Sequence, residues 1–122
     1  MKRFAWLLLF AVSAAAVAAD ASVDGKWDVS TSIAGYDGSM VCSFTQKDPA
    51  ISGSCTGDDG DHPLTGTVDG NKVTWQYKSE YNGQPLTITF TATVAAPDQF
   101  AGNVDVEPMG VGGDFTAKRK KQ

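Results

Sequence analysis

The stretch LTGTVDGNKVTWQYKSEYNGQPLTITFTATV, residues 64–94, decides the fold of this chain. It predicts three antiparallel strands joined by two tight turns, one over residues 69–71 and one at Asn82-Gly83. Asp-Gly and Asn-Gly are typical of hairpin turns because they tolerate positive φ at both central positions of a type I′ turn. Counting outward from the second turn places three apolar pairs on one face of the sheet: Tyr77 with Ile88, Trp75 with Phe90, and Val73 with Ala92.

The opposite face of the same three strands is polar. It carries Thr74, Gln76, Lys78, Thr87, Thr89, Thr91 and Thr93. Because side chains alternate between the two faces of a strand, this pattern indicates an antiparallel sheet with one buried face and one solvated face.

The same alternation predicts strands over the rest of the chain. Besides the three strands within residues 64–94, strands are expected at 25–33, 40–46, 51–57, 100–106 and 114–119, with turns at 35–38, 48–49, 58–63 and 96–98 and a loop at 108–113. A flat sheet of eight strands would leave two bare edges and an exposed apolar face. We therefore expect an all-β fold, an eight-stranded antiparallel up-and-down β-barrel, with a small sandwich as the alternative.

The first residues are typical of a secretory signal peptide. Lys2 and Arg3 precede an apolar run over residues 4–12, and small residues at 17–19 suit a signal peptidase. We expect residues 1–19 to be cleaved, with cleavage after Ala21 as the second choice, which leaves one β-barrel domain at 20–122. The protein is then periplasmic or secreted, and no membrane association is expected after processing.

The charge of the predicted mature chain argues against two classes of partner. Without Lys2 and Arg3, 8 basic residues stand against 14 acidic residues, a net charge of −6. An acidic domain of this size is poorly suited to nucleic acids or anionic membranes. The basic cluster at residues 118–121 is either a solubilising end or a patch for a partner.

Cys42 and Cys55 predict a disulfide, since an even number of cysteines in a secreted chain favours pairing. The two residues lie symmetrically about Asp48-Pro49 and face each other in that hairpin register. Nearby, Asp58, Asp59 and Asp61 form a weak candidate for a metal site, because Ca²⁺ prefers clustered oxygen ligands. Their spacing does not fit an EF-hand loop, and a hydrophilic turn is the simpler interpretation, so no cofactor and no metal is expected.

The layout resembles the calycin group of lipocalins, fatty-acid-binding proteins and avidins. Gly25-Lys26-Trp27 opens the first strand as Gly-x-Trp, and Arg119 lies in the last strand. The resemblance implies that Arg119 packs on Trp27 at the closed end of the barrel. Residues 64–67 look most like the avidin type, and the phrases GTVDGNKVTW, LTITFTATV and GDFTAKR resemble small secreted bacterial barrels. The polar residues that hold biotin in avidins have no counterpart among the inward positions.

A weaker resemblance is to periplasmic metalloprotease-inhibitor barrels, which also have Gly-x-Trp in the first strand and one disulfide. It implies an inhibitory N-terminal arm, here residues 20–23, which is shorter than that family's arm and acidic at its tip.

Chain order places the connections between strands 1–2, 3–4, 5–6 and 7–8 at one end of the barrel, which we expect to be open. The expected ligand-binding residues at that end and in the interior are Tyr36, His62, Trp75, Tyr77, Tyr81 and Met109. Eight strands leave room for side chains or one small ligand, and the sequence leaves both a filled core and a cavity open. No nucleophile lies beside His62 and no paired carboxylates face inward, so an enzyme is not expected.

These observations predict a secreted or periplasmic non-catalytic binding protein, a monomer that holds a small apolar or amphipathic ligand, or a partner, at the open end. The alternative is a periplasmic inhibitor of an exported protease.

Overall fold

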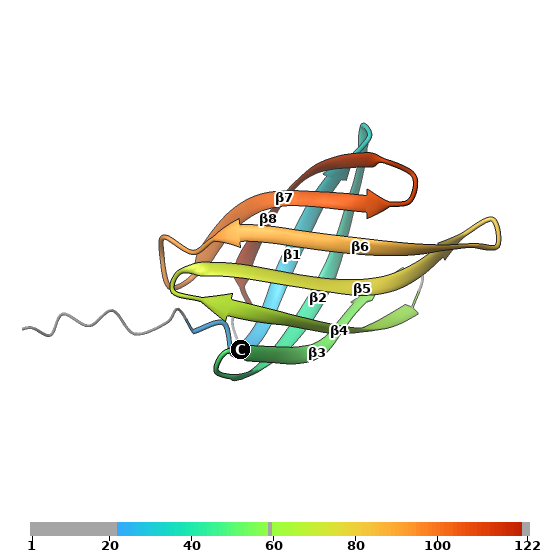
Figure 1. Cartoon of the computed structure of the whole chain (residues 1–122). Helices are drawn as coiled ribbons and strands as arrows, with labels where there is room; N and C mark the ends of the chain where they lie inside the picture. The colour runs from blue at the N-terminus through green and yellow to red at the C-terminus, as the bar shows by residue number, and fades with distance from the viewer. Residues whose placement is uncertain (1–21, 59, 121–122) are drawn as a thin grey trace, which may run out of the picture.

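The protein is a closed barrel of eight antiparallel strands in chain order (Figure 1). The structure, a computed structural model, describes residues 22–58 and 60–120. The first and last strands pair with each other, with Trp27 opposite Arg119, so the predicted up-and-down barrel is confirmed. The strands are β1 (Gly25–Ile33), β2 (Tyr36–Lys47), β3 (Ala50–Gly57), β4 (Gly60–Asp69), β5 (Lys72–Tyr81), β6 (Gln84–Thr93), β7 (Gln99–Glu107) and β8 (Val111–Arg119).

The hairpin registers counted from the sequence are confirmed. Trp75 pairs with Phe90 across β5 and β6, and Cys42 pairs with Cys55 across β2 and β3. On its other side Trp75 lies opposite Gly66 of β4. At the β5–β6 turn both Asn82 (φ 52°) and Gly83 (φ 79°) have positive φ, as a type I′ turn requires. The β4–β5 turn differs from the expectation, because Gly70 has positive φ whereas Asn71 does not. Glycine at the first central position is the type II′ pattern.

The strands at the open end are longer than the sequence pattern predicts. β2 begins at Tyr36 rather than at Met40, β8 begins at Val111, and β4 begins at Gly60 rather than at Leu64. The expected turn at residues 58–63 was therefore wrong over 60–63, and so was the expected loop at 108–113 over 111–113. Pairing of residues 60–63 with residues 54–57 of β3 outweighs the turn preference of this Asp- and Pro-rich segment. The chain turns instead at Ala34-Gly35, where both residues have positive φ.

The disulfide between Cys42 and Cys55 is present and links β2 to β3. The two residues are direct cross-strand partners, with their Cα atoms 4.0 Å apart, and both are fully buried. The pairing predicted from symmetry about the Asp48-Pro49 turn is thus confirmed. A disulfide of this kind is typical of an oxidising compartment.

Aromatic side chains fill the middle of the barrel. Trp75 stacks on Phe90 at 4.8 Å with 7° between the ring planes, and Phe44, Phe100 and Phe115 approach the indole edge-on. Glycine on a facing strand makes room for them. A Cβ atom at Gly66 would lie 2.1 Å from the Thr74 carbonyl oxygen and 2.7 Å from the Cα of Trp75. This region therefore has the filled core that the sequence left as one of two alternatives.

The end of the barrel near the chain termini is closed by Arg119. Its Cζ lies 4.4 Å from the centroid of the Trp27 ring. The guanidinium donates hydrogen bonds to the carbonyl oxygens of Asp24, Ser22 and Pro97. Val23 is fully buried beneath these contacts, and its carbonyl oxygen accepts a hydrogen bond from Trp27 Nε1.

Several expectations fall on residues outside the described ones. These are the signal peptide at 1–19, both cleavage sites, the arm residues Asp20 and Ala21, Asp59, and Lys121 of the basic cluster. Within residues 22–58 and 60–120, no helix has the length and apolarity needed to cross a membrane.

Candidate binding site at the open end of the barrel

A depression of about 670 Å³ lies at the end of the barrel opposite Arg119. Its floor and lower walls are aliphatic, from Leu86, Ile88, Val106 and Val111. The first three of these side chains are buried and pack on the core. We name this hollow the mouth depression. It is lined by Thr31, Ile33, Ala34, Tyr36, Asp37, Gly38, Ser79, Glu80, Tyr81, Leu86, Ile88, Val106, Met109 and Val111.

Three large apolar side chains surround the mouth depression and are exposed to solvent. The exposed fraction is 80% for Tyr36, 57% for Tyr81 and 45% for Met109. Among the described residues these are all the large hydrophobic side chains that are exposed, and all three line this one hollow. Clustered exposed apolar groups on an otherwise polar small protein mark a contact surface for another molecule.

Glycine at two inward positions contributes to the space at this end. Gly38 of β2 lines the mouth depression, and Gly38 and Gly57 both line a smaller pocket of about 230 Å³ beside it. On the same strands the buried inward residues nearer the core are larger, Cys42 and Phe44 on β2 and Cys55 and Ile51 on β3. The sequence left both a filled core and a cavity open. In the structure, aromatic side chains fill the middle of the barrel, and there is space at the mouth.

His62 and Tyr77 lie together in the smaller pocket. Their rings stack with centroids 4.8 Å apart and planes 21° apart. His62 Nδ1 is 3.1 Å from the Lys78 carbonyl oxygen, and the Tyr77 hydroxyl donates to Met40 Sδ at 3.8 Å. Thr31 lines this pocket and the mouth depression, so the two hollows adjoin.

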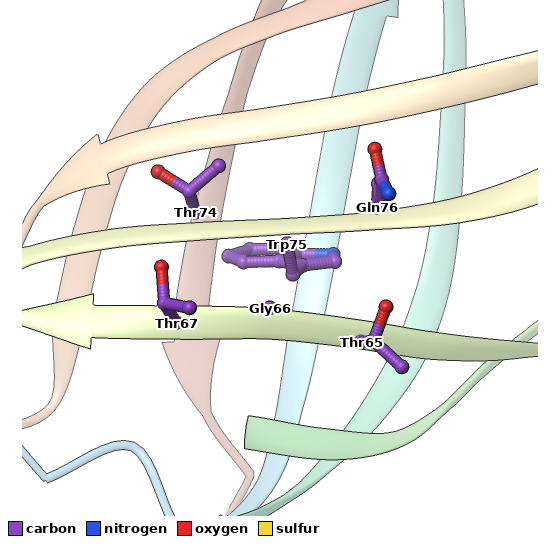
Figure 2. A pocket seen from close by; sticks show the side chains of 6 residues that line it. All are labelled: Thr65, Gly66, Thr67, Thr74, Trp75 and Gln76. Carbon is purple, nitrogen blue, oxygen red and sulfur yellow. The ribbon is translucent and has the colours of Figure 1, made fainter. Parts of the chain in front are cut away.

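Trp75 does not line either hollow at the mouth. It is fully buried in the aromatic core, and it also lines a shallow groove on the outer wall beside Gly66. Figure 2 shows Thr65, Thr67, Thr74 and Gln76 at the four corners of this groove around Trp75 and Gly66. The indole Nε1 is buried without a hydrogen-bond partner among the described residues.

Two of the three acidic residues proposed as a weak metal site, Asp58 and Asp61, are among the described residues, and Asp59 is not. Asp61 lies in β4 and accepts a hydrogen bond from Thr56 Oγ1, while Asp58 lines the smaller pocket. No group of three or more potential metal ligands occurs within residues 22–58 and 60–120.

The structure thus brings Tyr36, Tyr81 and Met109 to one hollow, and His62 and Tyr77 to the adjoining one. Sequence reasoning missed the polar and aliphatic lining residues Thr31, Ser79, Leu86 and Val106 as site residues. Extending the register count two pairs beyond Tyr77 and Ile88 places Ser79 opposite Leu86 at the mouth, and that signal was present in the sequence.

Comparisons with known proteins support the fold. No family model and no curated protein matches the chain. Among solved structures it is similar to a redesigned β-barrel, b11L5F_LGL, with a TM-score of 0.63, 17% identity, and coverage of 81% of this chain and 92% of that chain. It is also similar to a redesigned β-barrel, mFAP1, bound to DFHBI, with a TM-score of 0.61, 21% identity, and coverage of 80% and 94%. A third similar structure is EF1p2_mFAP2b bound to DFHBI, with a TM-score of 0.60, 18% identity, and coverage of 80% and 94%.

Proposed function

We propose that this protein is a non-catalytic binding protein that holds a small apolar or amphipathic molecule in the mouth depression. The observation that carries the proposal is the placement of Tyr36, Tyr81 and Met109, which expose their apolar surface around a single aliphatic hollow. Its volume of about 670 Å³ is within the range of roughly 300–1,000 Å³ typical of small-molecule sites. Two barrels of similar fold, mFAP1 and EF1p2_mFAP2b, have been seen with the small molecule DFHBI bound.

The filled middle of the barrel limits how the ligand lies. Trp75, Phe90 and Phe115 occupy the interior below the mouth with ring centroids 4.8–5.3 Å apart, and all three are buried. A ligand therefore lies shallow, with its apolar part on Leu86 and Ile88 and its outer part between Tyr36 and Tyr81. His62 and Tyr77 offer polar groups in the adjoining pocket.

Filling the hollow tests the proposal. Val111 lines the mouth depression and is partly exposed, so Val111→Trp places an indole in the space that a ligand would occupy. Thr45→Trp adds the same group at an exposed position of β2 outside the hollow, and serves as the matched control. Binding of the neutral fluorescent probe N-phenyl-1-naphthylamine is expected for the wild type and for Thr45→Trp, and a tenfold or greater loss of affinity for Val111→Trp. Equal affinity in all three proteins contradicts the proposal.

The protease-inhibitor alternative lacks such an observation. An inhibitory arm must protrude, but Val23 is fully buried and Arg119 binds the carbonyl oxygens of Ser22 and Asp24. If the mature chain begins at Asp20, two residues precede the segment at 22–24 that Arg119 holds by hydrogen bonds. Secretion, the signal peptide and the monomeric state remain predictions that belong to the same proposal.

A further inference from the structure

We infer that the ligand of the mouth depression is an organic cation with an apolar body, such as a hydrophobic amine or quaternary ammonium compound. This inference rests on the proposed function and specifies the ligand class. Its basis is an unequal distribution of charge along the barrel axis, combined with tyrosine rings at the place where the polar end of a bound amphiphile would lie.

Acidic residues border both hollows at the mouth. Asp37 and Glu80 line the mouth depression, and Asp58 lines the adjoining pocket. Glu107, the last residue of β7, is exposed at the same end. None of the residues lining either hollow is a lysine or an arginine. The potential at the mouth is therefore negative, which raises the local concentration of cations and opposes anions.

The basic residues of the described chain lie mostly at the opposite end. Lys78 alone among them belongs to the half near the mouth, and it points to the outer wall, where its Nζ donates to Thr87 Oγ1 at 2.9 Å. It therefore does not neutralise the acids inside the hollow. The others lie in the half closed by Arg119: Lys26, Lys47, Lys72, Lys118, Arg119 and Lys120.

The two rim tyrosines add a specific attraction for a cation. Tyr36 and Tyr81 line the hollow from β2 and β5 and are 80% and 57% exposed. The face of an aromatic ring attracts ammonium groups, and quaternary ammonium groups are bound in this way by aromatic side chains. An apolar chain on Leu86 and Ile88 would carry its charged end outward to the level of these rings and of Glu80.

A series of three probes with the same apolar chain tests the inference. Decyltrimethylammonium is cationic, decyl sulfate is anionic, and decyldimethylamine oxide is neutral at pH 8. Each is titrated into the mature protein below its micelle concentration, by calorimetry, at low salt and again at 0.5 M NaCl. We expect the cation to bind on the order of tenfold more tightly than the neutral probe at low salt, with a smaller preference at high salt.

Charge variants locate the effect. Asp37→Asn/Glu80→Gln removes two acids that line the hollow, and is expected to lower the affinity for the cation at least threefold while leaving the neutral probe unchanged. Asp28→Asn/Asp69→Asn removes two exposed acids outside the hollow and is the matched control, with unchanged binding.

Each outcome has a distinct meaning. Preference for the cation that falls with salt and in Asp37→Asn/Glu80→Gln supports the inference. Equal binding of the three probes, or tightest binding of decyl sulfate, overturns it and leaves the binding function intact. Equal loss of cation binding in both double variants also overturns it, since a general loss of negative charge would then explain the preference. Binding of none of the probes overturns the inference together with the proposed function.

Discussion

Removal of the disulfide is the perturbation whose cost can be worked out most directly from this structure. The change is Cys42→Ala/Cys55→Ala. The two cysteines are 13 residues apart and close a loop that contains the β2–β3 hairpin. Because both sit on neighbouring strands that pair along their length, the barrel keeps its hydrogen-bonded register without the covalent link.

The magnitude follows from the entropy of the unfolded chain. Closing a loop of about 14 residues restricts the unfolded state by roughly 3 kcal/mol at 25 °C in the chain-entropy model. A domain of this size has a total stability of about 5–15 kcal/mol. We therefore expect the double variant to fold and to lose about 3 kcal/mol in the free energy of unfolding.

The assay is urea denaturation followed by tryptophan fluorescence, which reports on the buried Trp27 and Trp75. With slopes of about 1–3 kcal/mol per molar urea, the midpoint is expected to fall by about 1–3 M. Wild-type protein reduced with dithiothreitol is the control and should shift by a similar amount. A loss below about 0.5 kcal/mol in both would refute the reasoning, because the unfolded chain would then be compact without the cross-link.

Three further substitutions test the packing of the barrel, each by urea denaturation. Gly66→Ala is expected to lower the free energy of unfolding by at least 3 kcal/mol. Overpacking costs about 1–3 kcal/mol where side chains can adjust, and here the Cβ would meet the backbone of Thr74 and Trp75. Thr65→Ala is the neighbouring control, and a loss below 1 kcal/mol in Gly66→Ala would contradict the geometry. Arg119→Lys keeps the charge but loses the guanidinium hydrogen bonds to three carbonyl oxygens, so we expect a loss of about 1–2 kcal/mol in the free energy of unfolding. No loss would show that the charge alone closes this end. Trp75→Phe is expected to lower the free energy of unfolding by less than about 1.5 kcal/mol, since removing a buried donor without a partner offsets the lost packing. A loss above 3 kcal/mol would show that the indole Nε1 has a hydrogen-bond partner.

The sequence predicts the sheet well because turn residues determine register. Asn82-Gly83 and Asp48-Pro49 each act as a centre from which pairs can be counted, and the count gives both the Trp75–Phe90 pair and the disulfide. Side chains then alternate with period two, so the inward residues follow without further information.

The site is less predictable because it depends on how far the strands extend beyond those pairs. Asp58, Pro63 and the glycines near them favour a turn locally, yet β4 begins at Gly60 and carries His62 inward onto Tyr77. The pairing of residues 60–63 with β3 is a cross-strand effect that local turn preference does not contain. Tyr36 was expected at the open end in a turn, and β2 instead begins at this residue.

The balance between core and cavity is also a tertiary property. Trp75 was expected among the ligand-binding residues because it faces inward, as Tyr77 does. Its depth along the axis, beside Phe90 and opposite Gly66, places it in the filled part of the barrel. A count of inward residues cannot distinguish these two levels.

Native mass spectrometry of the protein purified from its natural source tests the central claim most directly. The wild type is expected to carry a small organic molecule that leaves on denaturation, whereas Val111→Trp, expressed and purified in the same way, is expected to show the mass of the polypeptide alone. A bare wild-type polypeptide, or the same adduct on both proteins, would contradict the proposal that the mouth depression is a ligand site.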